Sequence, residues 1–187
     1  PETELVFATA TGNLERVQSL IKQNVPVNAK GMKGLTPVFL AAKNGHLKLM
    51  DYLIEQGANL KRRIMQGMSP LHFAGTPEIA QRLMELGLAP QQRTRLGLFP
   101  LHTAAQRGKA QVVSFFVKQG APVDLPTLIR MTPLHFAAEE GHTETVKTLL
   151  KLKANPEAKN IRGQTPALLA KRKGYQDIVP LLERLKD

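Results

Sequence analysis

The sequence contains no cysteine and no tryptophan among its 187 residues. The absence of cysteine excludes a disulfide framework and thiolate metal sites, and it is compatible with a reducing compartment. No apolar run approaches the ~20 residues that a membrane-spanning helix needs. No signal peptide is visible, although the chain begins with Pro1 rather than Met, which is compatible with an excised piece. Positive charge is in excess: 26 Lys and Arg against 15 Asp and Glu give a net charge of +11, which favours acidic partners or anionic surfaces.

One stretch, residues 131–150, reads as a helix, a turn and a second helix. Thr132 and Pro133 predict the start of the first helix, because a threonine hydroxyl can cap it and the missing N–H of proline costs nothing at the first position. Gly141 predicts its end, since the reversing chain needs a residue that tolerates positive φ. Thr143 is predicted to cap the second helix. One such hairpin cannot bury its own apolar face, so further copies are expected.

The proline of this stretch recurs at nearly regular intervals, at Pro37, Pro70, Pro100, Pro133 and Pro166. All the intervals are equal except the one from Pro70 to Pro100, which is shorter. The tripeptide Pro-Leu-His follows three times, from Pro70, Pro100 and Pro133. Counting back one regular interval from Pro37 reaches Glu4 and a matching segment with Gly12 at its turn. The pattern therefore covers nearly the whole chain.

The period and these motifs closely resemble the ankyrin-repeat family, whose hallmark is T-P-L-H-x-A in a repeat of about 33 residues. The family's Gly-His turn is found at Gly45 and Gly141, and its Gly-Ala pair at Gly57 and Gly120. The resemblance implies an all-α ankyrin-repeat solenoid of stacked helix-turn-helix units with β-hairpin loops, forming a single domain over residues 1–187. Six repeats are expected, the first and last as caps, at about residues 3–30, 36–63, 69–93, 99–126, 132–159 and 165–187.

Departures from the pattern predict local changes. The three residues missing from the third repeat belong to the turn between its helices, so we expect a shortened first helix and a local change in stacking angle. Thr76 and Pro77 predict the start of its second helix. Phe99 replaces the capping Thr of the fourth repeat and predicts a weaker helix start. Asn24 and Lys153 occupy the usual Gly position after a second helix, where Asn is tolerated and Lys should cost strain.

No catalytic or metal-binding constellation emerges. All five histidines lie in the repeat motif, and the resemblance implies that they hydrogen-bond backbone between repeats. Histidines spread along the array at repeat positions do not converge on a metal. Glu139 and Glu140 are adjacent at one helix end and point in different directions, and no phosphate-binding loop is present. We therefore expect a protein that is not an enzyme and that has no catalytic residue, metal or cofactor.

The resemblance implies that hairpin tips and first helices form the partner surface. Apolar residues stand at or beside the tips, and a run of them on one face would mark an interface. The alternative is that they pack between hairpins, and about half are expected to do so. Basic residues flank the same tips, whereas Glu139 and Glu140 could receive a basic group. The predicted partner-binding residues are Met32, Lys33, Leu35, Lys43, Arg63, Ile64, Met65, Met68, Arg95, Leu96, Leu98, Arg107, Leu128, Ile129, Arg130, Met131, Glu139, Glu140, Ile161, Arg162 and Arg172.

These observations predict a non-catalytic interaction module or adaptor, monomeric alone and located in the cytoplasm or nucleus. Its partner would be a protein with an acidic segment and apolar anchors, docked on a rigid concave surface. One alternative is binding of nucleic acid or anionic lipid through the positive charge, with affinity that collapses in salt. Another is a regulatory domain of a larger protein, or a bacterial effector acting in the host cytosol. The fold does not choose between them.

Overall fold

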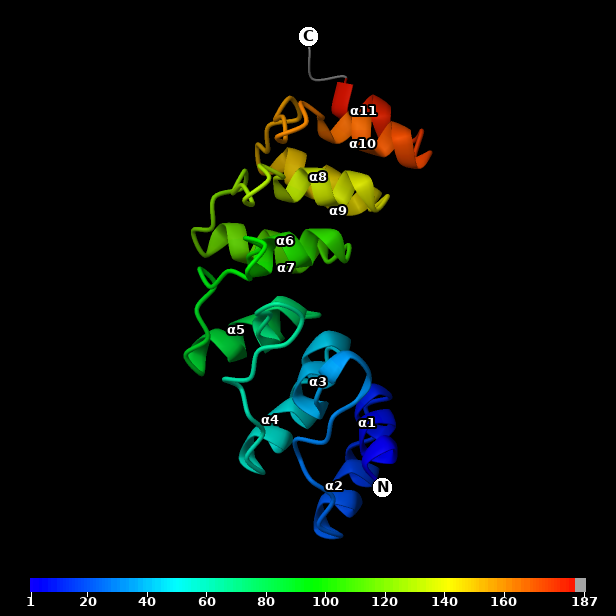
Figure 1. Ribbon diagram of the computed structural model, residues 1–187, viewed down its shortest axis with the longest axis vertical. Helices are drawn as coiled ribbons and strands as arrows, with labels where there is room; N and C mark the ends of the chain where they lie inside the picture. The colour runs from blue at the N-terminus through cyan, green and yellow to red at the C-terminus, as the bar shows by residue number, and fades with distance from the viewer. Residues whose placement is uncertain (184–187) are drawn as a thin grey trace. The chain divides into compact units, whose positions relative to one another are not determined.

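The computed structural model describes residues 1–183 as short helices joined by turns and loops, with no β-strand among those residues (Figure 1). Within this range no helix has both the length and the apolar character to cross a membrane. The chain divides into two compact units, Pro1–Ala89 and Pro90–Asp187. The division falls near the end of the third predicted repeat (residues 69–93), and the single-domain organisation stays a prediction. The last four residues of the predicted C-terminal cap, 184–187, lie outside the described residues.

The N-terminal unit contains three consecutive helix pairs. In each pair the first helix packs against the second helix that follows it, and the first helices of successive repeats within the unit lie side by side. The first helices are α1 (Glu2–Ala10), α3 (Pro37–Asn44) and the 3-10 turn η2 (Pro70–Phe73). The second helices are α2 (Leu14–Lys22), α4 (Leu47–Glu55) and α5 (Pro77–Glu85), and a 3-10 turn, η1 (Met32–Gly34), lies in the first connecting hairpin.

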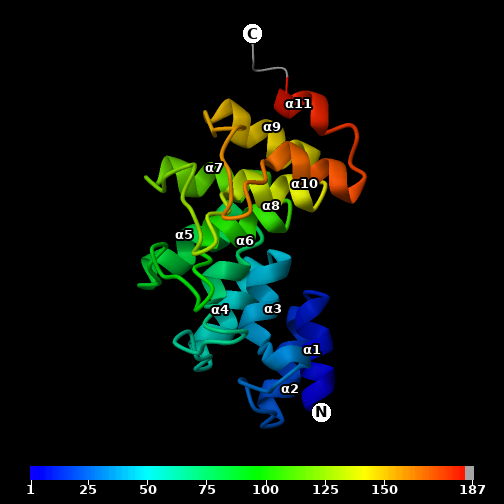
Figure 2. The same ribbon diagram turned by 45° about the horizontal axis from the view of Figure 1, so that its top comes forward.

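The C-terminal unit repeats this arrangement three more times. Its pairs are α6 (Pro100–Gln106) with α7 (Ala110–Lys118), α8 (Pro133–Glu139) with α9 (Thr143–Lys151), and α10 (Pro166–Lys173) with α11 (Val179–Glu183). Helix α8 packs between α6 and α10, and the layers are visible in both views (Figure 1, Figure 2). The connecting loops of this unit project toward the same side (Figure 1).

Burial between neighbouring repeats stabilises these helices. They are five to nine residues long, shorter than isolated helices that are stable in water. Leu134 on α8 and Leu149 on α9 are fully buried, as are Val146 and Ala137. Phe136 is also buried. Each repeat therefore depends on its neighbours for an apolar core, as the repeat pattern indicated.

The Thr-Pro motif starts first helices as predicted. Thr132 is extended, Pro133 is the first residue of α8, and the Nδ1 atom of His135 accepts the Thr132 N–H at 3.1 Å. The helix stops where Gly141 takes a φ of 78°. The predicted cap at Thr143 is wrong, because α9 begins at this residue itself and its hydroxyl donates instead to an Asp177 carboxylate oxygen at 3.0 Å.

The third repeat has the predicted short first helix, a single 3-10 turn. The N–H of Gly75 donates to the Ala42 carbonyl at 2.9 Å, and a Cβ atom at Gly75 would lie only 2.3 Å from the Lys43 carbonyl oxygen. Glycine therefore permits a backbone contact with the preceding repeat that no larger residue allows. The Thr76 hydroxyl then accepts the Ile79 N–H at 3.3 Å and begins α5, as predicted.

Three smaller expectations concern single positions. Asn24 and Lys153 adopt φ values of 62° and 68°, so both occupy the left-handed conformation expected at the usual Gly position. The expected weak start of the fourth repeat is offset, because His102 Nδ1 accepts the Phe99 N–H at 3.1 Å and α6 still begins at Pro100.

Four of the five histidines connect repeats through their Nε2 atoms, as the family resemblance implied. Their partners are backbone carbonyl oxygens of neighbouring repeats or of the hairpins between them. The pairs are His46 with Ala10 at 3.2 Å, His102 with Leu125 at 2.7 Å, His135 with Gln164 at 3.0 Å and His142 with Gln106 at 2.9 Å.

Candidate partner-binding grooves

The hairpin tips are compact five-residue turns, at residues 31–35, 64–68, 94–98, 127–131 and 160–164. In each turn the N–H of the first residue donates to the carbonyl of the fifth, as from Thr127 to Met131 at 2.9 Å. The first side chain can also accept a bond, and the Thr127 hydroxyl receives the Met131 N–H at 3.1 Å. The only regular pairing in these loops, within residues 1–183, is the isolated bridge between Ile64 and Met68. The predicted β-hairpins are therefore very short.

Most of the predicted partner-binding residues are at least partly accessible. Exposed residues are Met32, Lys33, Lys43, Arg63, Met65, Arg95, Leu96, Leu128, Ile129, Arg130, Glu140, Ile161, Arg162 and Arg172. Half-buried residues are Leu35, Met68, Leu98, Arg107 and Glu139. Burial lowers the pKa of Arg107 from its ordinary value, and its guanidinium still stays charged at neutral pH.

Two predicted contact residues are buried. Ile64 and Met131 are each only 7 % exposed. Ile64 is the first residue of its turn, a position that is buried in four of the hairpins, and Met131 is the fifth residue, next to the start of α8. Their side chains pack beneath the tips, so the expectation that they anchor a partner from an exposed tip was wrong.

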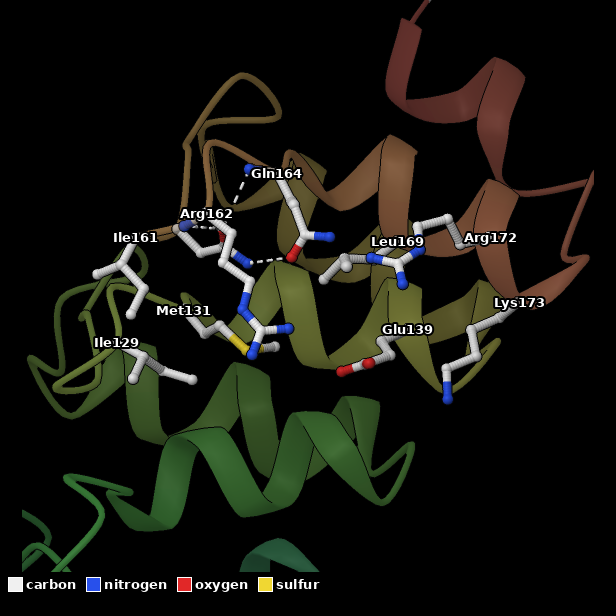
Figure 3. A pocket seen from close by; sticks show the side chains of 10 residues that line it. Ile129, Met131, Glu139, Ile161, Arg162, Gln164, Leu169, Arg172 and Lys173 are labelled. Carbon is white, nitrogen blue, oxygen red and sulfur yellow. Dashed lines mark hydrogen bonds between the residues drawn. The ribbon is translucent and has the colours of Figure 1, made fainter.

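A groove on the C-terminal unit collects six of the predicted residues. We call it the arginine groove, and its volume is about 360 Å³. Its side chains come from two hairpin tips and from α8 and α10 (Figure 3). The lining residues are Ile129, Met131, Glu139, Asn160, Ile161, Arg162, Gln164, Leu169, Arg172 and Lys173.

Hydrogen bonds fix the hairpin that forms one wall of the arginine groove. The Asn160 side-chain oxygen accepts the N–H groups of Arg162 at 2.9 Å and Gln164 at 3.0 Å, and the Asn160 amide nitrogen donates to the Gln164 side chain at 3.0 Å (Figure 3). The Ile161 N–H donates to the Ile129 carbonyl at 3.1 Å and joins this tip to the preceding one. The wall is therefore preorganised, which reduces the entropy lost on binding.

Positive charge dominates the lining. Arg162, Arg172 and Lys173 stand against the single carboxylate of Glu139. Among the described residues, none of these four side chains makes a hydrogen bond or an ion pair. Arg162 extends from the hairpin toward Met131, whereas Arg172 comes from α10 (Figure 3). Unpaired guanidinium groups are suited to bidentate contacts with a carboxylate.

A second groove lies on the N-terminal unit, and we call it the apolar groove. Its volume is about 590 Å³. It is lined by α1, the first hairpin tip and α3. The residues are Thr3, Val6, Phe7, Ala10, Lys30, Gly31, Met32, Leu35, Leu40 and Lys43.

The two grooves occupy equivalent positions in their repeats, related by the shift along the chain that takes Pro37 to Pro166. This shift pairs tip residues, first-helix apolar residues and helix-end cations. The equivalent pairs are Met32 with Ile161, Leu35 with Gln164, Leu40 with Leu169, Lys43 with Arg172, and Ala10 with Glu139. Equivalent places in two pairs of repeats therefore form grooves that are lined by different side chains.

The structure brings together fewer than half of the predicted residues. The apolar groove contains Met32, Leu35 and Lys43 in addition to the six in the arginine groove. The remaining predicted residues line neither groove: Lys33, Arg63, Ile64, Met65, Met68, Arg95, Leu96, Leu98, Arg107, Leu128, Arg130 and Glu140. The main omission is Phe7. Projecting Leu40 back by one regular repeat interval reaches it, so the repeat register identifies its position, whereas its exposure is seen only in the structure.

Comparison with known proteins agrees with this fold. The family description "Ankyrin repeats (3 copies)" matches residues 5–94, 74–160 and 101–185. The chain therefore belongs to the ankyrin-repeat family, and ankyrin repeats are generally protein–protein interaction modules. No curated protein matches the chain. Within residues 1–183, no group of three or more His, Asp or Glu side chains is placed to hold a metal ion.

Proposed function

We propose that this protein is a non-catalytic adaptor that binds a partner protein carrying an acidic segment with apolar anchors. The observation that supports it is the arginine groove, where unpaired cations lie beside exposed isoleucines. An acidic side chain would contact Arg162 and Arg172, and apolar side chains would cover Ile129 and Ile161. The lack of cysteine fits the proposed location in the cytoplasm or nucleus, or in the host cytosol for an effector.

The two kinds of side chain would play different parts in binding. Ile129 is 47 % and Ile161 61 % exposed, so each has apolar area left to bury, at about 25 cal/mol per Å². The cations would mainly speed association and select partners by charge. Affinity should therefore depend on the isoleucines at any ionic strength and on the arginines most strongly at low salt.

The test uses a short labelled peptide that combines Glu with Leu and Phe, and two comparison peptides with Lys for Glu or Ser for the apolar residues. Fluorescence anisotropy is measured at about 50 mM and about 200 mM salt. The double variant Ile129→Glu/Ile161→Glu should weaken binding of the first peptide at least about tenfold, equivalent to about 1.4 kcal/mol. The control Leu168→Glu alters an exposed leucine on α10 that does not line the groove, and it should bind normally.

A competing function, binding to nucleic acid or anionic lipid, is favoured by the net charge of +11. Duplex DNA and phosphatidylserine vesicles therefore serve as further probes in the same assay. If they bind more tightly than the acidic peptide, lose affinity steeply with salt and are indifferent to the isoleucine variant, the adaptor proposal is wrong.

A further inference from the structure

The apolar groove of the N-terminal unit exposes two large hydrophobic side chains from different elements. Phe7 on α1 is 69 % exposed and Met32 on the first hairpin tip is 84 % exposed. Both line the same groove of about 590 Å³, together with Leu35 and Leu40. Single exposed apolar residues are ordinary on a protein surface, but a contiguous set that lines a groove marks an interaction site.

The lining on α1 forms one stripe along the helix. Thr3, Val6, Phe7 and Ala10 follow the spacing of i, i+3, i+4 and i+7, which places them on one face. The shift that relates the two grooves takes Phe7 to Phe136, which is only 9 % exposed on α8. The same repeat position is therefore packed in the C-terminal unit and accessible in the N-terminal unit.

A glycine lies at the closest approach of the hairpin to α1 in this groove. A Cβ atom at Gly31 would lie 2.9 Å from Val6 Cγ1, so only glycine lets the hairpin approach α1 this closely. The equivalent residue in the arginine groove is Asn160, whose side chain occupies its turn with hydrogen bonds. Val6 and Leu35 line the groove beside Gly31.

The charges around the apolar groove have one sign. Lys30 and Lys43 are exposed lining residues, and no carboxylate lines the groove, since Ala10 stands where the arginine groove has Glu139. A ligand that fills this groove therefore needs apolar side chains at its centre and carboxylates at its edges.

We propose that the apolar groove binds an amphipathic helix of a partner protein, with large apolar side chains on one face and Asp or Glu beside them. A helix presents anchors one turn apart on the same side. An extended segment would direct alternate side chains away from the groove. A second copy of this chain is disfavoured by charge, because each copy carries a net +11. The inference rests on the proposed partner-binding function, but it concerns a different groove and a different unit.

The probe is a labelled helical peptide of Leu, Ala and Glu, about 18 residues long, with Leu at i, i+3, i+4 and i+7. One comparison peptide has the same composition in scrambled order, and another has Lys in place of Glu. The full chain should bind the first peptide at least about tenfold more tightly than either comparison. The double variant Phe7→Asp/Met32→Asp should lose this difference while its thermal midpoint is unchanged, because both side chains are exposed.

Two control variants identify the groove that is responsible. Leu96→Asp changes an exposed leucine outside both grooves, and Ile129→Glu/Ile161→Glu changes the arginine groove alone. Both should bind the helical peptide as the wild type does. One result would separate the two proposals: Ile129→Glu/Ile161→Glu loses binding of the acidic peptide, while Phe7→Asp/Met32→Asp still binds the helical peptide. The proposed function would then stand, and this inference would be overturned.

Other occupants give different results. A concentration-dependent dimer that disappears in Phe7→Asp/Met32→Asp, measured by sedimentation, would make the groove a self-association site and overturn the inference. Phosphatidylserine vesicles that bind through the same two residues more tightly than the peptide would also overturn it. If the Glu and Lys peptides bind equally, the proposal that the partner helix carries Asp or Glu beside its apolar face is wrong.

Discussion

The Nε2 atom of His135 lies 3.0 Å from the carbonyl oxygen of Gln164 and joins helix α8 to the end of the last hairpin. On the other side of the ring, Nδ1 accepts the Thr132 N–H at 3.1 Å. A neutral imidazole with its proton on Nε2 satisfies both contacts, whereas a proton on Nδ1 would face the Thr132 N–H. Burial lowers the pKa of His135 from its ordinary 6.5.

This histidine predicts a loss of stability at mildly acidic pH. Because the folded pKa is lower than the unfolded one, the unfolded chain takes up the proton first as the pH falls. The stability that the neutral side chain of His135 contributes is therefore present above pH 6.5 and decreases as the pH falls below it. Urea unfolding at about pH 7.5 and about pH 5.5 should show a smaller loss for His135→Gln than for wild type. Equal losses would mean that other groups cause the pH dependence.

The buried leucines between repeats should determine the stability of the C-terminal unit. Leu134→Ala on α8 or Leu149→Ala on α9 would leave a cavity in a fully buried layer and should destabilise the fold by roughly 2–5 kcal/mol. Ile161→Ala at an exposed tip should change it by less than about 0.5 kcal/mol. Thermal and urea unfolding measure both. No loss for either leucine variant would contradict the stacking of the repeats.

Local signals in the sequence predicted the helices, because the Thr132-Pro133 start and the Gly141 end act within one turn of the chain. The exposure of tip side chains was harder to predict, since it depends on the neighbouring hairpin and helix. Met131 and Ile161 are both apolar residues of hairpin turns, yet one is packed beneath its tip and the other is open.

Phe7 illustrates the same limit for the candidate site. Its repeat position is packed at Phe136, so the sequence pattern favours a core residue, and only the three-dimensional surroundings of α1 show that it is accessible. The repeat register pairs Gly31 with Asn160 in the sequence, but only the structure shows that a groove with a different lining lies beside each of them.

The third repeat provides a prediction about backbone contact. In Gly75→Ala the new methyl group would collide with the Lys43 carbonyl oxygen, 2.3 Å away, and would disturb the bond from the Gly75 N–H to Ala42. We expect a loss of roughly 1–3 kcal/mol in unfolding free energy. Gly57→Ala is not a suitable control, because Gly57 has a φ of 89°. Ser19→Ala in α2 is a suitable control. If it lowers the unfolding free energy as much as Gly75→Ala does, the loss in Gly75→Ala is not due to the close approach of the backbone.

Arg130 predicts opposite effects on stability and binding. It is the fourth residue of its hairpin turn and has a φ of 58°, at a position that is glycine in the other four turns, as at Gly97 and Gly163. An L side chain in this conformation is strained, whereas glycine is not, although glycine also loses more chain entropy on folding. Arg130→Gly should therefore stabilise the fold by up to about 1 kcal/mol.

The same substitution removes a cation next to Ile129, so it should weaken binding of the acidic peptide, most clearly at low salt. Arg130→Lys keeps both the charge and the backbone strain and should change neither property. Lys153 has the same left-handed conformation, with a φ of 68°, but lies away from the tips. Lys153→Gly should therefore relieve the backbone strain and raise stability without altering affinity. Unfolding and anisotropy measured on the three variants separate the two effects. Two results would contradict the view that Arg130 strains this turn and contributes to binding. One is an Arg130→Gly variant that is less stable than wild type, and the other is unchanged binding of the acidic peptide by this variant at low salt.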